Sequence, residues 1–326
     1  MGSLDSSRGN DSKNERDRLL INGIEYSHVK NRLTGGAIYT NQDKSVYVKT
    51  GRRSDVLKEM AISKDLLKRG FQVPRIIDEG GTLPSGEWFY IEESIGDRIF
   101  GDIFKEETIA NGQVGEDSLN DFVTVIENYC RAQFDPTNHL PPDRAALDKM
   151  AALDNVMIYN PPSETTRVAF ATAYGQAAEK VQRIPWGYVQ SDLNVFNMLR
   201  GGVIDFELAD HGPIGYDTIS CLYFGRMWPA KQVAYHMTDD QIKRCVAAID
   251  AEAVKHGLSP LSDLSEEFLV IKSIWGTAKK KKSSQEDPEK YKDFWTWRVK
   301  VRDWCIERYL KGKKIDSNLF DDIGSS

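Results

Sequence analysis

The stretch VQSDLNVFNMLRGGVIDFE, residues 189–207, constrains this chain more than any other feature of its sequence. Its apolar runs predict strands over 186–190 and 203–204, joined by a loop that holds polar side chains. If the chain folds back through the Arg-Gly-Gly turn, Asn197 and Asp205 come close together. An amide oxygen and a carboxylate suit Mg²⁺, which is usually held by one or two carboxylates together with substrate phosphates and water.

Asp192 lies five residues before Asn197 and remains available for a different task. A carboxylate beside a metal-held phosphate can orient an attacking hydroxyl group and accept its proton. A single Asp at a strand end is ordinarily a turn or cap residue. Together with Asn197 and Asp205, however, Asp192 indicates phosphoryl transfer.

The same residues carry a family resemblance. The segments SDLNVFNML and VIDFE resemble the catalytic segment of the aminoglycoside phosphotransferase and choline kinase family, whose members share the protein-kinase fold. The resemblance implies that Asp192 is the catalytic base, that Asn197 and Asp205 bind Mg²⁺, and that Glu207 assists at the metal. It also implies an α+β, bilobal fold with an N-terminal antiparallel sheet, one main helix beside it, and a mostly helical C-terminal lobe.

The resemblance assigns residues upstream of this segment as well. Lys49, at the end of a predicted strand, matches the phosphate-binding lysine, and Glu59 matches the acid that pairs with it. Residues 92–96 resemble the hinge, where the adenine base would bond to the carbonyl group of Glu93 and the amide group of Ile95.

Two further features resemble the family pattern and two depart from it. Thr34, Gly35 and Gly36 resemble the glycine-containing loop over the phosphates, but without the full G-x-G-x-x-G spacing a simple hairpin entry is an equal alternative. Asp217 matches the acid that braces the backbone of the catalytic loop. Gln190 replaces the usual His, for which we expect an altered rate or geometry rather than loss of activity. The apolar pair VF before Asn197 places the loop closer to the hydrophobic core.

The hydrophobic pattern divides the chain into three parts: a disordered N-terminus over 1–18, a nucleotide-binding lobe over 19–95, and a catalytic and substrate-binding lobe over 97–326. The first lobe should contain a hairpin over 36–49 and a helix over 54–69. Further helices are expected over 118–134, 143–153, 163–181, 239–256 and 264–279, and a last one should begin at Asp287 and Pro288 with a core stripe of Phe294, Trp297, Val301, Trp304 and Cys305.

The composition excludes several classes of protein. With 40% hydrophobic residues, the 326-residue chain can fill a core divided between two lobes, and a net charge of −6 gives no support for nucleic-acid binding. No apolar run approaches a membrane span and no secretory signal is visible, so the cytoplasm is the expected location. The four cysteines are far apart in the sequence and are interpreted as reduced core thiols.

Two short segments have a less specific interpretation. The start MGSLDS matches the permissive myristoylation pattern at Gly2, although a disordered or vector-derived start is the interpretation that we favour. The run over 279–282 consists of four lysines, which we interpret as a solvated loop.

These features together predict a kinase that uses Mg²⁺ and ATP, with GTP as the alternative nucleotide, to phosphorylate a hydroxyl group of an aminoglycoside, amino-alcohol or sugar-like acceptor. Two alternatives stay open: a pseudokinase that binds nucleotide or partners, supported only by Gln190, and a Ser/Thr protein kinase, whose Ala-Pro-Glu element is missing here. No Walker loop or hydrolase motif is present, and oligomeric state leaves no signal. Four acids make a cationic acceptor plausible: Glu207, Asp210, Asp239 and Asp240.

Overall fold

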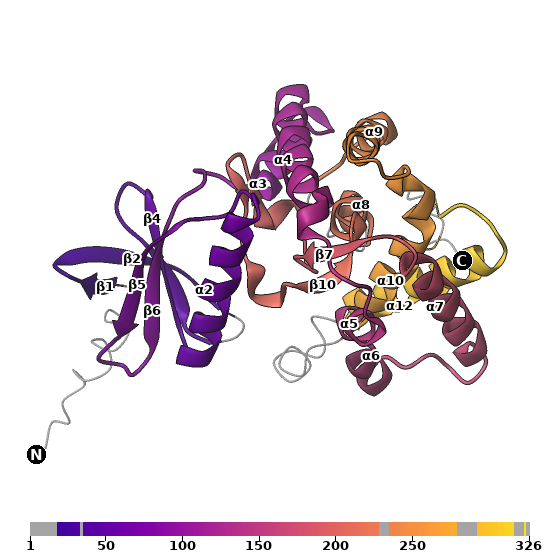
Figure 1. Cartoon of the computed structure of the whole chain (residues 1–326), viewed down its shortest axis with the longest axis horizontal. Coiled ribbons are helices and arrows are strands. Elements are labelled where there is room, and N and C mark those ends of the chain that lie inside the picture. The colour runs from indigo at the N-terminus through magenta and orange to yellow at the C-terminus, as the bar shows by residue number, and fades with distance from the viewer. Residues whose placement is uncertain (1–17, 33–34, 228–234, 279–291, 316–322, 324–326) are drawn as a thin grey trace, which may run out of the picture. The chain divides into compact units, whose positions relative to one another are not determined.

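The structure of the chain is a computed structural model (Figure 1) that describes residues 18–32, 35–227, 235–278, 292–315 and 323. It contains two compact units. The first comprises the chain up to Asp97 together with Gly201–Glu207, and the second comprises the rest. The predictions for the N-terminal segment with Gly2, for Thr34, for the four-lysine run and for the start of the last helix at Asp287 and Pro288 lie outside the described residues.

The first unit is an antiparallel sheet with one main helix, as predicted. Its six strands are ordered β1-β2-β3-β4-β6-β5, and α2 packs against β4, β5 and β6 (Figure 1). The elements are β1 Arg18–Ile21, β2 Ile24–Asn31, β3 Ala37–Thr40, β4 Val46–Gly51, α2 Arg53–Lys68, β5 Ile76–Thr82, β6 Trp88–Glu93 and the short β9 Gly202–Val203.

The period-two alternation of β4 sends neighbouring residues to opposite faces of the sheet. Val48 is paired with Ile91 and belongs to the apolar cluster on one face. Lys49 is paired with Tyr90, whose ring packs with Val56 of α2 on the other face. The hydrophobic packing of the sheet therefore determines that the Lys49 side chain is directed towards α2.

The second unit is mainly helical, as predicted. Its helices are α3 Phe100–Asn111, α4 Glu116–Phe134, α5 Arg144–Met150, α6 Leu153–Tyr159, α7 Arg167–Val181, α8 Tyr216–Leu222, α9 Asp239–Lys255, α10 Ser265–Trp275 and α12 Lys292–Leu310. Its strands are β7 Trp186–Val189, β8 Met198–Leu199 and β10 Asp210–Pro213, and its 3-10 turns include η1 Pro136–Asn138, η2 Val195–Asn197, η4 Phe224–Met227 and η6 Leu261–Leu264. The turn η3 Phe206–Leu208 spans the sequence boundary between the two units.

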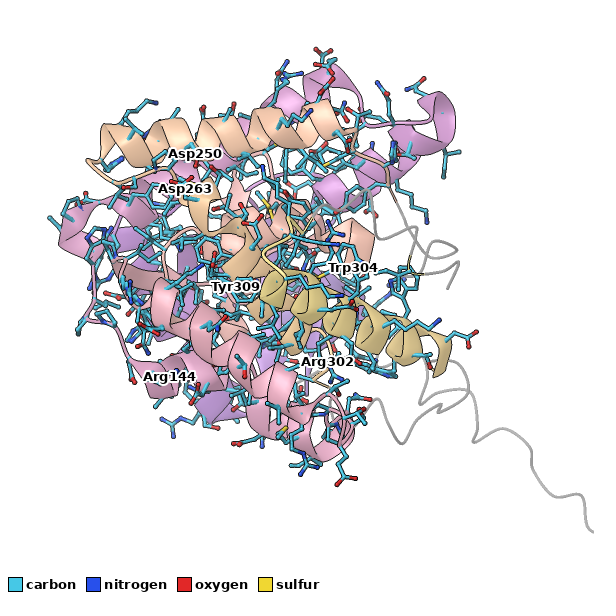
Figure 2. All side chains as sticks on the ribbon, turned by 90° about the vertical axis from the view of Figure 1, so that its right-hand side faces the viewer. Arg144, Asp250, Asp263, Arg302, Trp304 and Tyr309 are labelled. Atoms are coloured by element: carbon cyan, nitrogen blue, oxygen red, sulfur yellow. The ribbon has the colours of Figure 1, made fainter. Side chains whose placement is uncertain are left out.

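Two helices form the interior of this second unit. Every residue of α8 is buried, and α10 is buried continuously over 267–274. A helix that is enclosed on all sides is apolar around its whole circumference in most proteins, so the polar residues within α8 and α10 require an explanation. Outside these two helices, Arg302, labelled on α12 in Figure 2, is a further buried cation, and its guanidinium donates to the carbonyl oxygen of Asn160 at 2.6 Å.

Several predicted elements differ from those in the structure. The helix expected over 143–153 is interrupted because Ala152 adopts a left-handed conformation with φ of 52°. The helix expected to reach residue 279 ends at Trp275. In the predicted core stripe of α12, Phe294, Val301 and Cys305 are buried, whereas Trp297 and Trp304 are only partly buried.

The cysteines and the apolar character of the helices were two further points of the sequence analysis. Cys130, Cys221, Cys245 and Cys305 are all free and buried, as predicted. None of the described helices combines the length and the apolar character needed to cross a membrane.

Two glycines of the first unit provide a matched test of the packing of β5 on β6. Gly80 and Gly86 both have positive φ, +71° and +86°, but an added Cβ would overlap the carbonyl oxygen of Phe89 at Gly80 and meet nothing within 4 Å at Gly86. We predict that Gly86→Ala lowers the free energy of unfolding by about 1 kcal/mol, from backbone strain. Gly80→Ala should lower it by about 1–3 kcal/mol more, from the additional overlap. Urea unfolding of both variants measures this difference, and equal losses would contradict it.

Candidate functional site

The predicted ion pair between Lys49 and Glu59 is present in the first unit. The Lys49 ammonium lies 2.8 Å from a carboxylate oxygen of Glu59 on α2 and 3.1 Å from one of Glu92 on β6. The side chains of the three residues are at most 9% exposed. The lysine is therefore held between two buried acids, of which sequence reasoning identified only Glu59 as a partner.

Arg32 is a second cation in this cluster. Its guanidinium forms a short ion pair with Glu59, donates to the backbone oxygen of Thr50 at 3.2 Å, and lies 3.5 Å from the Glu207 carboxylate. The Arg32 side chain is only 6% exposed. Sequence reasoning missed this residue, although its position two residues before the candidate glycine loop was a usable signal.

The charges in this cluster shift one another's pKa values. Burial would lower the pKa of the Lys49 ammonium, but Glu59 and Glu92 raise it well above its ordinary value. Burial would raise the pKa of the Glu59 carboxyl, but Lys49 and Arg32 together hold it below its ordinary value. Glu92 is different, because burial outweighs the attraction of Lys49 and raises the pKa of its carboxyl. Glu59 is thus the more firmly ionised of the two acids.

Backbone hydrogen bonds join the described residues on the two sides of the candidate glycine loop. The Arg32 N–H donates to the Gly36 carbonyl at 3.0 Å, and the Gly35 N–H donates to the Arg32 carbonyl at 3.2 Å. Gly35 and Gly36 have φ of +100° and +80°, and a Cβ on Gly36 would overlap the Thr50 carbonyl group. Packing against β4 therefore explains the glycine at position 36.

The segment 201–207 belongs to the first unit and is held by backbone bonds. The Gly201 N–H donates to the carbonyl oxygen of Ile95 at 2.8 Å, and the Val203 N–H donates to that of Gln72 at 2.9 Å. Asp205 has φ of +66°, a conformation that is strained for most residues and that clusters at functional sites. In the predicted hinge, the Glu93 N–H donates to the Arg75 carbonyl oxygen at 2.9 Å, and the carboxylate of Glu93 pairs with the Arg75 side chain.

In the second unit, two side-chain amides hold the backbone of Asp192. The Nδ2 atoms of Asn194 and Asn197 both donate to the Asp192 carbonyl oxygen, at 2.6 and 3.1 Å. The Oδ1 atom of Asn194 also accepts the Phe196 N–H at 2.9 Å and so caps the short turn that carries Asn197. The predicted residues Asp192 and Asn197 are thus brought together, and Asn194 is a further organising residue that sequence reasoning missed.

The apolar residues of this loop pack into the core, as predicted. Val195 is 1% exposed. Phe196 lies against Gly101 of α3 so closely that a Cβ there would overlap its ring. Hydrophobic packing of Val195 and Phe196 therefore anchors the loop that contains Asp192.

Asp217 of α8 braces the same loop, which confirms the predicted contact. Its buried carboxylate accepts the N–H groups of Gln190 at 2.5 Å and Ser191 at 3.1 Å, and the hydroxyl group of Tyr129 at 2.8 Å. Burial raises the pKa of the Asp217 carboxyl, although Tyr129, the charge of Lys272 and the two N–H groups oppose the shift. Gln190 is 1% exposed, at the end of β7.

Three of the four acids that suggested a cationic acceptor lie beside basic side chains of the chain itself. Asp210 forms a short ion pair with Lys149, Asp240 lies 3.2 Å from Lys243, and Glu207 lies 3.5 Å from Arg32. These three contacts belong to separate pairs, so they give no support for a shared cation-binding site.

The chain is similar in sequence to one enzyme family and in fold to several solved structures. Residues 37–249 match the sequence pattern of the phosphotransferase enzyme family. The chain resembles a thermostable mutant of aminoglycoside phosphotransferase APH(4)-Ia in ternary complex with ADP and hygromycin B, with 11% identity, a TM-score of 0.55, and 86% of this chain and 93% of that chain covered. No match was found among curated proteins.

Two further solved structures have the same fold. A candidate aminoglycoside phosphotransferase from Ralstonia eutropha JMP134 is 10% identical, with a TM-score of 0.58 and coverage of 93% of this chain and 97% of that chain. Aminoglycoside phosphotransferase APH(3'')-Id from Streptomyces rimosus is 15% identical, with a TM-score of 0.50 and coverage of 77% and 92%. At these identities the likeness establishes the fold, which is the bilobal kinase-like fold expected from the sequence.

The two acids around Lys49 should respond to pH with opposite signs. The pKa of Glu59 is below its ordinary value of 4.5 in the folded chain, so its contribution to stability is present above pH 4.5 and is lost as the pH falls through the folded pKa. The pKa of Glu92 is above 4.5, so its contribution is present below pH 4.5 and is lost as the pH rises.

We therefore predict that Glu59→Gln lowers the free energy of unfolding by about 3 kcal/mol at neutral pH, because two buried cations lose their shared partner. This penalty should shrink below pH 4.5. The matched variant Glu92→Gln should become more stable relative to the parent as the pH rises above 4.5. Urea unfolding between pH 3 and 7 measures both slopes, and slopes of the same sign would contradict the assignment.

Proposed function

Because the chain belongs to the phosphotransferase enzyme family, and is therefore a small-molecule kinase, we propose that it transfers the γ-phosphoryl group of ATP to a hydroxyl group of a small acceptor. Structural neighbours were solved with ADP or AMP-PNP and with hygromycin B. They support an adenine nucleotide, with GTP as the alternative, and an aminoglycoside, amino-alcohol or sugar-like acceptor.

In this proposal Asp192 is the general base. The observation that carries the assignment is the fixed backbone of Asp192, whose carbonyl oxygen accepts both the Asn194 and the Asn197 amide groups. The acceptor oxygen forms a bond to the γ-phosphorus atom, the bond from that phosphorus to the bridging oxygen breaks, and the proton of the hydroxyl group moves to the Asp192 carboxylate. ADP is the leaving group. Positioning and electrostatics supply most of the rate.

Lys49 is proposed to bind the α- and β-phosphates of the nucleotide. Its ammonium already lies between Glu59 and Glu92. A buried cation that is shared by two acids carries a desolvation cost that phosphate binding would help to offset. We further propose that the loop of Thr34, Gly35 and Gly36 covers the phosphates, and that the backbone groups of Glu93 and Ile95 bind the base.

We propose that Asn197, Asp205 and Glu207 hold Mg²⁺, because amide and carboxylate oxygens are the ligands that this ion prefers. Since the Nδ2 atom of Asn197 is bonded to the Asp192 carbonyl oxygen, its Oδ1 atom is the one that can bind a cation. Asp205 and Glu207 would supply carboxylate oxygens, and Glu207 would then exchange its contact with Arg32. Mg²⁺, when bound, neutralises phosphate charge during transfer.

The proposed reaction is tested by following ADP release from ATP and Mg²⁺ in the presence of separate panels of aminoglycosides, amino-alcohols, sugars and Ser/Thr peptides. We expect acceptor-dependent ADP release with one of the small-molecule panels and a mass increase of the acceptor by one phosphoryl group. Phosphorylation of the peptides alone would favour a protein kinase. Nucleotide binding without ADP release in any panel would favour a pseudokinase.

Replacement of the proposed base separates chemistry from nucleotide binding. Asp192→Asn should lower kcat by about 10²–10⁴-fold, since the proton acceptor is lost. The Kd for ATP should change by less than about twofold, because the base contacts the acceptor rather than the nucleotide. Asp263→Asn, on η6 of the same unit, is the matched control and should retain the parent kcat. Parent-like turnover of Asp192→Asn would exclude this role.

A further inference from the structure

Lys272 is a buried ammonium that the chemistry described so far does not use. It lies in the middle of α10, is 1% exposed, and sits 3.9 Å from the centre of the Trp275 ring. Burial lowers the pKa of Lys272, although Asp192 and Asp217 oppose the shift. Isolating a charge in this way is costly unless the charge has a specific partner. Among the described residues, the hydrogen bond that Lys272 makes is to the carbonyl oxygen of Ser191, at 3.0 Å.

Ser191 is the residue directly before the proposed base, and its backbone is strained. Its φ is +69°, in the left-handed region that disfavours residues other than glycine. Such conformations persist only where the surroundings enforce them. Ser191 is also 5% exposed, so its peptide groups need partners within the protein.

Two opposite charges meet the backbone of Ser191 from two helices. The Asp217 carboxylate of α8 accepts its N–H at 3.1 Å, and the Lys272 ammonium of α10 donates to its C=O at 3.0 Å. Asp217 alone fixes only the N–H side of the residue. Loss of Lys272 would leave a buried carbonyl oxygen without its charged donor, and relaxation of φ at Ser191 would be the simplest relief.

We propose that Lys272 is a positioning residue for phosphoryl transfer, which together with Asp217 holds Ser191 in its left-handed conformation and so fixes the direction of Asp192. This inference rests on the proposed function. The competing explanation is that Lys272 only balances the charges of Asp192 and Asp217. The ion pairs formed by the described residues do not include one between Lys272 and either acid, whereas the bond to Ser191 is direct.

The test compares Lys272→Met with Ile271→Ala, a matched control at a fully buried neighbour on α10. Lys272→Met should lower kcat for ADP release by about 10- to 100-fold, because a small misplacement of the base is costly, while the Kd for ATP changes by less than about twofold. Amide hydrogen exchange over 190–197 should become faster. Ile271→Ala should lose stability but keep the parent kcat and the parent exchange rates in this loop.

Rescue by a second substitution distinguishes positioning from charge balance. Glycine adopts positive φ at little cost, so Ser191→Gly in the Lys272→Met background should recover part of kcat. A charge-balancing role predicts no recovery. If Lys272→Met does not fold, the same measurements on Lys272→Gln, which retains a neutral donor, should give an intermediate loss of kcat.

The positioning role of Lys272 and the proposed function can fail separately. Parent-like kcat and parent-like loop exchange in Lys272→Met would overturn the proposal, and so would a loss of ATP affinity in proportion to the loss of kcat. If the parent chain phosphorylates no acceptor, the proposed function fails. Hydrogen exchange over 190–197 then decides the positioning role on its own, because that readout does not require turnover.

Discussion

The buried carboxylate of Asp217 is the constraint on which the loop around Asp192 in the second unit depends. It accepts two consecutive backbone N–H groups, those of Gln190 and Ser191, immediately before Asp192. A buried carboxylate is costly unless several donors satisfy it, and here two of the donors are the peptide groups directly before Asp192, the proposed base. The side-chain amide groups of Asn194 and Asn197 hold the backbone carbonyl group of Asp192 itself. The loop is therefore fixed on both sides of Asp192 by polar groups inside an apolar unit.

In the first unit a buried carboxylate is also satisfied by several donors, but here the donors are side chains instead of backbone groups. Glu59 is shared by Lys49 and Arg32, and this double pairing keeps it ionised despite burial. The arrangement holds two cations at the end of β4 and beside the turn that precedes β3. Because they are pre-positioned, little side-chain ordering remains when an anionic ligand binds. A phosphate-binding role for this cluster is consistent with the family to which the chain belongs.

Sequence reasoning succeeded where partners lie close together along the chain. The loop from Asp192 to Asn197 and the helix with Glu59 follow from short spacings that a motif records. The brace by Asp217 is more distant, 26 residues after Ser191, and was predicted from the family resemblance alone. It failed where partners are set by strand register or by helix packing. Glu92 reaches Lys49 from two residues beyond Tyr90, the register partner of Lys49, and Arg32 lies beside Glu59. The break at Ala152 was equally inaccessible, because an alanine gives no local signal for a left-handed conformation.

A crystal structure of the chain with Mg²⁺ and a non-hydrolysable ATP analogue tests the central claim most directly. The account predicts that the Lys49 ammonium contacts the α- and β-phosphates while it retains Glu59, and that Asn197 Oδ1 and an Asp205 carboxylate oxygen both coordinate the metal. Phosphates bound elsewhere on the chain, with Lys49 still enclosed by Glu59 and Glu92 and the metal away from Asn197 and Asp205, would contradict it.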